Sequence, residues 1–207
     1  MQKKPVPLRE RNRLDTWALI HNAASSLALE GGLTHATVEA IAESAGVSKR
    51  TFFNYFPTKE DAVLGIQAPT LTADAENAFR TSESPDLFGR TVHLMVAVIR
   101  TMFPAESFTS QRRELSKQFP ELRKRMVEHV GAAEQLVESV LMERYNDHDA
   151  FRAGLPGGRD SAAALLMLAG TVTRFTYKRD PGAAFSDGAG AVDEAIEIFR
   201  EVIQATL

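Results

Sequence analysis

The feature of this sequence that most constrains its fold is residues 37–59, TVEAIAESAGVSKRTFFNYFPTK, which predict two short helices around a single glycine. Thr37 and Ser48 stand where a side-chain oxygen caps the first turn of each helix. Gly46 supplies the left-handed backbone that a tight corner between two helices needs. The apolar positions fall on one face of each helix, at Val38, Ile41, Ala42, Ala45, Val47, Phe52 and Phe56. The pattern predicts a helix-turn-helix.

Further helices are predicted on both sides of this segment. Upstream, one helix ends at Gly31 and Gly32, and its apolar face is formed by Trp17, Ile20, Ala24, Leu27 and Ala28. Downstream, Pro57 ends the second short helix, and Thr58 with Asp61 opens the next as a capping pair. Pro69 then predicts either a kink or an early stop in that next helix.

The second short helix gathers side chains that suit DNA. They are Lys49, Arg50, Thr51, Asn54 and Tyr55, followed by Lys59. Lys and Arg donate to guanine, Asn pairs with adenine, and hydroxyl groups with Lys suit phosphate oxygens. On spacing alone, a short-helix bundle with a basic solvated face stays an alternative.

The stretch AESAGVSKRTFFNYFPTKEDAV resembles the N-terminal domain of the TetR family of bacterial transcriptional regulators. The resemblance covers roughly residues 14–64. It implies an all-α protein with an N-terminal three-helix DNA-binding domain, followed by a helical ligand-binding and dimerisation domain. We therefore expect domains at residues 14–58 and 59–207.

Carried over by position, the resemblance implies phosphate contacts for Thr37 and Ser48 and base contacts for Lys49, Arg50 and Asn54. It assigns Lys59 to the DNA backbone. The family pattern has a tyrosine where this chain has Phe53 and a histidine where it has Tyr55, so Tyr55 is the candidate replacement for the usual tyrosine–phosphate bond. Glu39 repels DNA and is excluded as a contact.

The N-terminal part of the chain carries the excess basic charge. Residues 1–60 hold eight Lys or Arg and six Asp or Glu, whereas the remaining residues hold 16 and 21. We expect a basic arm over residues 1–13, built on Lys3, Lys4, Arg9, Arg11 and Arg13. Such an arm tracks phosphates or reaches a minor groove; a merely solvated arm is the alternative.

Beyond residue 63 the pattern stays helical. Ser84 and Pro85 predict the start of a strongly apolar helix, and Pro120 predicts another that runs to about Tyr145. The last two predicted helices carry small residues around Ala162–Gly170 and an amphipathic stripe over Val192–Ile203. The resemblance implies that these two helices form a homodimer interface; the alternative is that they only complete the core of one chain.

The resemblance also implies an effector pocket in the second domain. The flexible or aromatic candidates are Met95, Met102, Phe103, Phe108, Phe119, Met126, Met167 and Phe175, although each of these is also suited to an ordinary core. The stretch SQRRELSKQFPELRKRM resembles regulators of the mycofactocin-system type, which implies a small apolar or acyl-CoA-like effector. Arg112, Arg113, Arg123 or Arg125 would then pair with its phosphates, or serve only as surface charges.

Other function classes find little support in the sequence. The chain has no cysteine, which excludes disulfides and thiolate metal sites. Its five histidines are scattered, and no nucleophile stands with a base, so we expect no metal, no cofactor and no enzymatic activity. No apolar run reaches membrane-spanning length, and a cytoplasmic protein is expected.

The predicted function is a ligand-responsive repressor that binds a palindromic operator as a dimer. The alternatives are an effector-independent DNA-binding protein and, less favoured, a helical enzyme.

Overall fold

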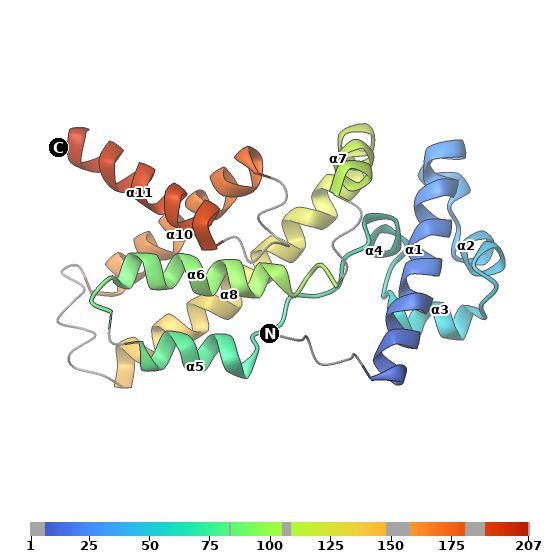
Figure 1. The fold of residues 1–207 in the computed structure, drawn as a ribbon. Coiled ribbons are helices and arrows are strands. Elements are labelled where there is room, and N and C mark those ends of the chain that lie inside the picture. Colours follow the sequence, from blue (N-terminus) through green and yellow to red (C-terminus); the bar gives the residue numbers. More distant parts are fainter. Residues whose placement is uncertain (1–6, 83, 105–108, 148–157, 181–188, 207) are drawn as a thin grey trace. The chain divides into compact units, whose positions relative to one another are not determined.

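The computed structural model describes residues 7–82, 84–104, 109–147, 158–180 and 189–206, and within these ranges every regular element is a helix (Figure 1). The predicted all-α fold is confirmed. The chain divides into two compact units. The first unit comprises Met1–Gln67 and Phe103–Val127, and the second comprises Ala68–Met102 and Glu128–Leu207. The described residues between Phe103 and Val127 thus belong to the same unit as the N-terminal helices, whereas the sequence analysis expected them in the second domain.

The described part of the first unit contains five complete helices: α1 (Leu8–His35), α2 (Val38–Ser44), α3 (Lys49–Tyr55), α4 (Lys59–Leu64) and α7 (Thr109–Gln118). The first residues of α8 (Pro120–Asp147) also belong to it. In Figure 1, α2 and α3 are joined by a tight turn and lie beside α1. The predicted helix-turn-helix is therefore present.

The first helix begins earlier than the sequence suggested. It follows Pro7 directly and is helical from Leu8, so Arg9, Arg11 and Arg13 lie on a helix and not in an arm. The residues that follow Pro7 are rich in Leu, Arg and Glu, which favour a helix, and this explains the early start. Lys3 and Lys4 lie outside the described residues. The helix runs on to His35, but its regular part is interrupted at the predicted glycines, where the backbone of Gly32 leaves the helical region at φ 78°.

The core of the first unit consists of apolar side chains from all of its helices. Trp17, Ile20, Phe52 and Phe56 are at most 1% exposed, and Leu115 of α7 and Leu122 of α8 are fully buried in the same cluster. The stacking is partly aromatic, since the Trp17 and Phe56 ring centroids are 5.4 Å apart. The predicted inward faces of α1 and α3 are thus confirmed, and two later helices complete this core.

Three predicted caps and one predicted turn fix the short helices. The hydroxyl oxygens of Thr37, Ser48 and Thr58 each accept a hydrogen bond from the N–H three residues later, at 3.0–3.2 Å. Gly46 turns the chain between α2 and α3 with a φ of 66°, which a residue with a Cβ rarely adopts. These local signals set the orientation of α3.

The helix before Pro69 stops early. Its end is Leu64, and Gly65 follows in the left-handed conformation at φ 60°. A Cβ on Gly65 would lie 2.8 Å from the ring of His21, so a close approach to α1 also requires glycine here. Of the two predictions for this segment, the early stop is correct, and the helix ends five residues before the proline.

The second unit contains α5 (Ala73–Thr81), α6 (Leu87–Arg100), the rest of α8, α10 (Arg159–Arg179) and α11 (Ala189–Thr206). The predicted apolar helix is α6, and it packs on α5, α10 and α11. It starts two residues later than expected, because the carboxylate of Asp86 accepts from the Gly89 N–H at 2.9 Å and caps the helix in place of Ser84. Within the described residues, no helix is long and apolar enough to cross a membrane.

Candidate nucleic-acid interface

The helix α3 presents its polar residues outward from the core of the first unit. Phe52 and Phe56 are fully buried, whereas Lys49, Arg50 and Asn54 are exposed. Thr51 and Tyr55 are half-buried, and Tyr55 packs against the core. The structure therefore brings the predicted base-contacting residues together on one exposed helix face.

The predicted phosphate contacts at helix starts are chemically available. Thr37 and Ser48 are exposed, and each uses its oxygen to accept the capping N–H. A hydroxyl group that accepts through its oxygen keeps its own hydrogen for another acceptor. The Ser48 and Thr51 hydroxyl oxygens are 2.9 Å apart, so one of these two hydroxyl groups donates its hydrogen to the other. Thr37 is thus the hydroxyl that suits a phosphate oxygen best.

Glu39, which the sequence analysis excluded as a DNA contact, pairs with Lys49, one of the predicted base contacts. Its carboxylate forms an ion pair with the Lys49 ammonium group, which joins α2 to α3 on the surface. This contact lowers the pKa of Glu39. Both side chains are more than half exposed, so the pair competes with solvent and is weak. The bond to Glu39 uses one of the three hydrogens of the Lys49 ammonium group and leaves two for another acceptor.

The predicted backbone contact Lys59 also has a partner within the unit. Its ammonium group donates to the carbonyl oxygen of Leu33 at 2.6 Å, which ties the start of α4 to the end of α1. Lys59 is half-buried. An ammonium group has three hydrogens, so this bond leaves two for a phosphate oxygen.

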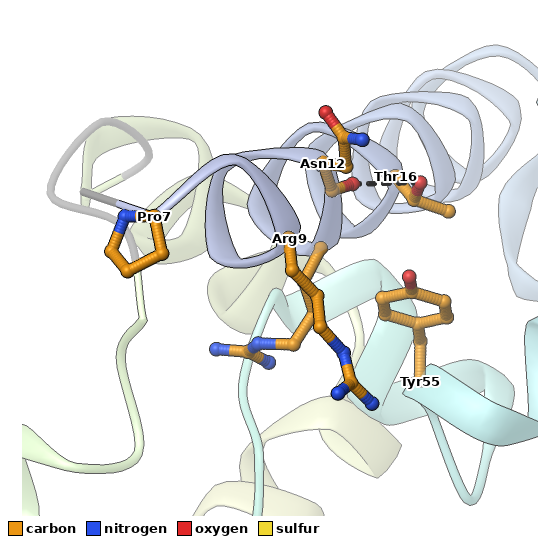
Figure 2. Close-up of a pocket in the computed structure, with 6 residues that line it drawn as sticks. Pro7, Arg9, Asn12, Thr16 and Tyr55 are labelled. Carbon is orange, nitrogen blue, oxygen red and sulfur yellow. Dashed lines mark hydrogen bonds between the residues drawn. The ribbon is translucent and has the colours of Figure 1, made fainter.

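Two aromatic residues of α3 differ in their surroundings. Phe53 is 56% exposed on the outward side of the helix and touches the buried Phe52 ring edge-on, at 5.3 Å between centroids. Tyr55 borders a groove together with Pro7 and with Arg9, Asn12, Arg13 and Thr16 of α1 (Figure 2). Sequence reasoning missed both features. The exposed apolar ring is visible only once the helix faces are known, and the groove depends on the early start of α1.

The capped α2–turn–α3 unit with exposed Lys49, Arg50 and Asn54 is the arrangement that enters a DNA major groove. Residues 20–65 match the family described as bacterial regulatory proteins, tetR family. The match identifies this part of the chain as the DNA-binding domain of TetR-family transcriptional regulators. A search of curated proteins found no match. Regulators of this family are in general DNA-binding proteins and not enzymes, and no group of three or more metal-ligating side chains occurs among the described residues.

The structure distributes the candidate effector residues of this TetR-family chain over both units. Phe103, Phe119 and Met126 pack against the core of the first unit. In the second unit, Met95 and Met102 are fully buried. Phe175 packs against Phe199 at 5.5 Å between ring centroids, and Met167 is 74% exposed. Phe108 lies outside the described residues. The matched family region ends at residue 65, so the acyl-CoA-like resemblance of the second domain stays a proposal.

Two of the arginines considered for effector phosphates have internal partners. Arg112 of α7 donates to the carbonyl oxygens of Leu64 and Gly65, at 2.7 and 3.2 Å, and burial lowers its pKa to about 10. Arg125 of α8 donates to both carboxylate oxygens of Asp61 at 2.8 Å. Both contacts fix α4: Asp61 belongs to its first turn, and Leu64 and Gly65 form its end. Arg113 and Arg123 are exposed.

Proposed function

We propose that this TetR-family regulator binds a palindromic operator as a homodimer and represses transcription until a small, largely apolar effector releases it. The observation that carries the proposal is the packing of α3. Its Phe52 and Phe56 side chains are fully buried, and Lys49, Arg50 and Asn54 lie on its exposed face. Such a helix suits direct reading of base edges in the major groove. A cytoplasmic location belongs to the same proposal.

The proposed dimer uses α10 and α11. Met167 and Leu168 of α10 are 74% and 39% exposed, and Val202 and Ile203 of α11 are 57% and 38% exposed. Exposed Ala163 and Ala164 lie on the same helix as the first pair and permit close helix approach. Large apolar side chains gathered on neighbouring helices are typical of a protein interface. Two copies would place two reading helices on successive half-sites.

The proposed release acts through α4. Arg112 and Arg125 connect α7 and the start of α8 to the two ends of α4. The helix α4 packs on α1 in the first unit, which is called the reading unit below because it contains α3. An effector that favours a different position of α7 or α8 would therefore displace α4 and the helices packed on it. Release requires only that the effector bind the two states with different affinity, and about 1 to 3 kcal/mol of coupling suffices.

Footprinting of the gene's own upstream region tests operator binding. We expect the purified protein to protect an inverted repeat, and Arg50→Ala or Asn54→Ala to relax the base preference at one position per half-site by about 1 to 3 kcal/mol. Arg113→Ala removes an exposed arginine far along the sequence from α3 and serves as the control. Protection without any sequence preference would contradict direct reading.

The exposed ring of Phe53 gives this test a finer probe. An apolar ring in the major groove suits the methyl group of thymine. We expect one thymine per half-site at which replacement by deoxyuridine, which removes only that methyl group, weakens binding of the wild-type protein. Phe53→Ala should bind the two DNAs equally. A variant that keeps the full preference for thymine would exclude Phe53 from the reading surface.

Sedimentation tests the dimer. We expect a dimer at micromolar concentration and a monomer for Met167→Glu, because a buried carboxylate opposite its symmetry mate costs several kcal/mol. Val127→Glu is the matched control, since Val127 is also exposed, at 65%, and belongs to the first unit. A wild-type protein that stays monomeric with DNA present would overturn this assembly.

The effector test needs a variant that spares the reading unit. Met126 packs against the core of that unit, so a bulky residue there would disturb α1–α4. Phe175→Trp in the second unit is the better choice. We expect palmitoyl-CoA or palmitate to lower operator affinity of the wild-type protein and to act less on this variant. If a panel of acyl-CoAs, fatty acids and lipophilic drugs changes neither melting temperature nor operator binding, the effector-independent alternative is favoured.

A further inference from the structure

The start of α1 and the end of α3 enclose a groove of about 470 Å³. Its lining comes from both elements: Pro7, Arg9, Asn12, Arg13 and Thr16 belong to the α1 side, and Tyr55 is the last residue of α3. Figure 2 shows Arg9 extending from α1 toward the side where the Tyr55 ring stands. The groove thus joins two segments that lie 39 to 48 positions apart in the sequence, within one unit.

The lining chemistry suits an anion. Arg9 and Arg13 are four residues apart, so both guanidinium groups lie on the same face of the helix. Among the described residues that line the groove, none is acidic, and no ion pair of the described residues engages Arg9. The Thr16 hydroxyl donates to the Asn12 carbonyl at 2.9 Å, which leaves the Asn12 amide and the Tyr55 hydroxyl as neutral donors. Guanidinium groups match the geometry of phosphate oxygens.

The position of the groove selects the source of that phosphate. With seven residues, α3 is about 10 Å long, close to the roughly 12 Å width of the major groove. A helix of that length inserted across the groove meets one strand's backbone at each end. Thr37 and Ser48 lie at or before the start of α3, whereas Tyr55 and Arg9 lie at its end.

We propose that this groove seats a backbone phosphate of the operator, held by Arg9 and Arg13 with the Tyr55 hydroxyl as third donor, on the strand opposite the one that Thr37 and Ser48 contact. The proposal rests on the proposed operator binding. In this arrangement the Tyr55 hydroxyl takes the place of the tyrosine–phosphate bond that Phe53 cannot make, and the basic start of α1 contacts the same phosphate.

Methylphosphonate substitution tests the assignment, because it removes the charge of one phosphate at a time. We expect one position per half-site at which the neutral linkage weakens binding of the wild-type protein by about tenfold, the order of one charge-assisted hydrogen bond. Arg9→Ala should lose this sensitivity, and Tyr55→Phe should lose part of it. Arg9→Ala should also lower the slope of log K against log salt by about 0.9 per half-site.

Arg11→Ala is the matched control. Arg11 is exposed in the same turn of α1 but does not line the groove, so its removal changes the net charge equally and should leave the methylphosphonate profile intact. Identical profiles for Arg9→Ala and Arg11→Ala, with operator binding retained, would overturn the proposal alone. A wild-type protein that protects no operator would instead overturn the proposed function. If inorganic phosphate binds the wild-type protein and not Arg9→Ala while no linkage depends on Arg9, the groove holds a free anion and the proposal fails.

Discussion

Two arginines of the first unit bind buried groups inside it, whereas two arginines of the second unit pair with carboxylates on its surface. Arg112 is 6% exposed and Arg125 pairs with an Asp61 that is fully buried. In the second unit, Arg80 pairs with a Glu143 that is 57% exposed, and Arg179 and Glu194 are 50% and 59% exposed. The loss of stability on breaking an ion pair depends on whether a charge is left buried. Removing one charge should therefore destabilise the protein more at the buried contacts than at the exposed pairs.

The largest effect is expected at Arg125. Its removal leaves the Asp61 carboxylate buried without its bidentate partner, so Arg125→Ala should lower the free energy of unfolding of the reading unit by about 3 kcal/mol. Urea denaturation measures the change. Arg123→Ala, an exposed arginine of the same helix, should change it by less than about 0.5 kcal/mol. A loss below about 1 kcal/mol for Arg125→Ala would show that Asp61 is compensated by other contacts.

Sequence reasoning succeeded where the signal is local and failed where the partner is distant. The caps at Thr37, Ser48 and Thr58 and the turn at Gly46 depend on residues within one helical turn, and all are present. Arg112 and Arg125 looked like surface charges, because their partners lie 47 to 64 positions away. No periodicity in the sequence reports such pairs.

The same distinction explains the candidate site. The exposed face of α3 followed from helical spacing alone. The ion pair of Lys49 with Glu39 and the bond from Lys59 to Leu33 depend on how α2, α3 and α4 pack, which spacing does not determine. The effector candidates were chosen by side-chain type, and residue type does not say whether Met126 lies in the reading unit or Met167 on a surface.

A pH effect of intermediate size is expected from His21, which lies inside the first unit. The pKa of His21 is lowered from 6.5 to about 4, and burial is the largest cause of this shift. The hydrogen bond to the Ala62 carbonyl opposes the shift, and the charge of Arg112 adds to it. Between these two pKa values the unfolded chain binds a proton that the folded chain does not. Stability is therefore full above pH 6.5 and falls as the pH drops toward 4.

Between pH 7 and pH 5 this single group should remove about 2 kcal/mol from the free energy of unfolding. His21→Asn keeps a donor for the Ala62 carbonyl and cannot titrate, so the difference between the two proteins isolates the effect. His35→Gln is the control, because His35 is exposed. Parallel stability curves for wild type and His21→Asn over this range would contradict a buried neutral imidazole.

The smallest effect is expected at the surface pair of the second unit. Arg80 contacts both Glu76, four residues earlier on α5, and Glu143 of α8. Because Glu143 is more than half exposed and Arg80 keeps Glu76, Glu143→Gln should lower the free energy of unfolding by no more than about 0.5 kcal/mol. Salt screens exposed charges, so the difference should vanish in about 1 M NaCl. Glu138→Gln, exposed on the same helix, is the control. A loss above about 1.5 kcal/mol that persists in high salt would mean that this pair is shielded from water, and the contrast between the two units would then be one of position and not of burial.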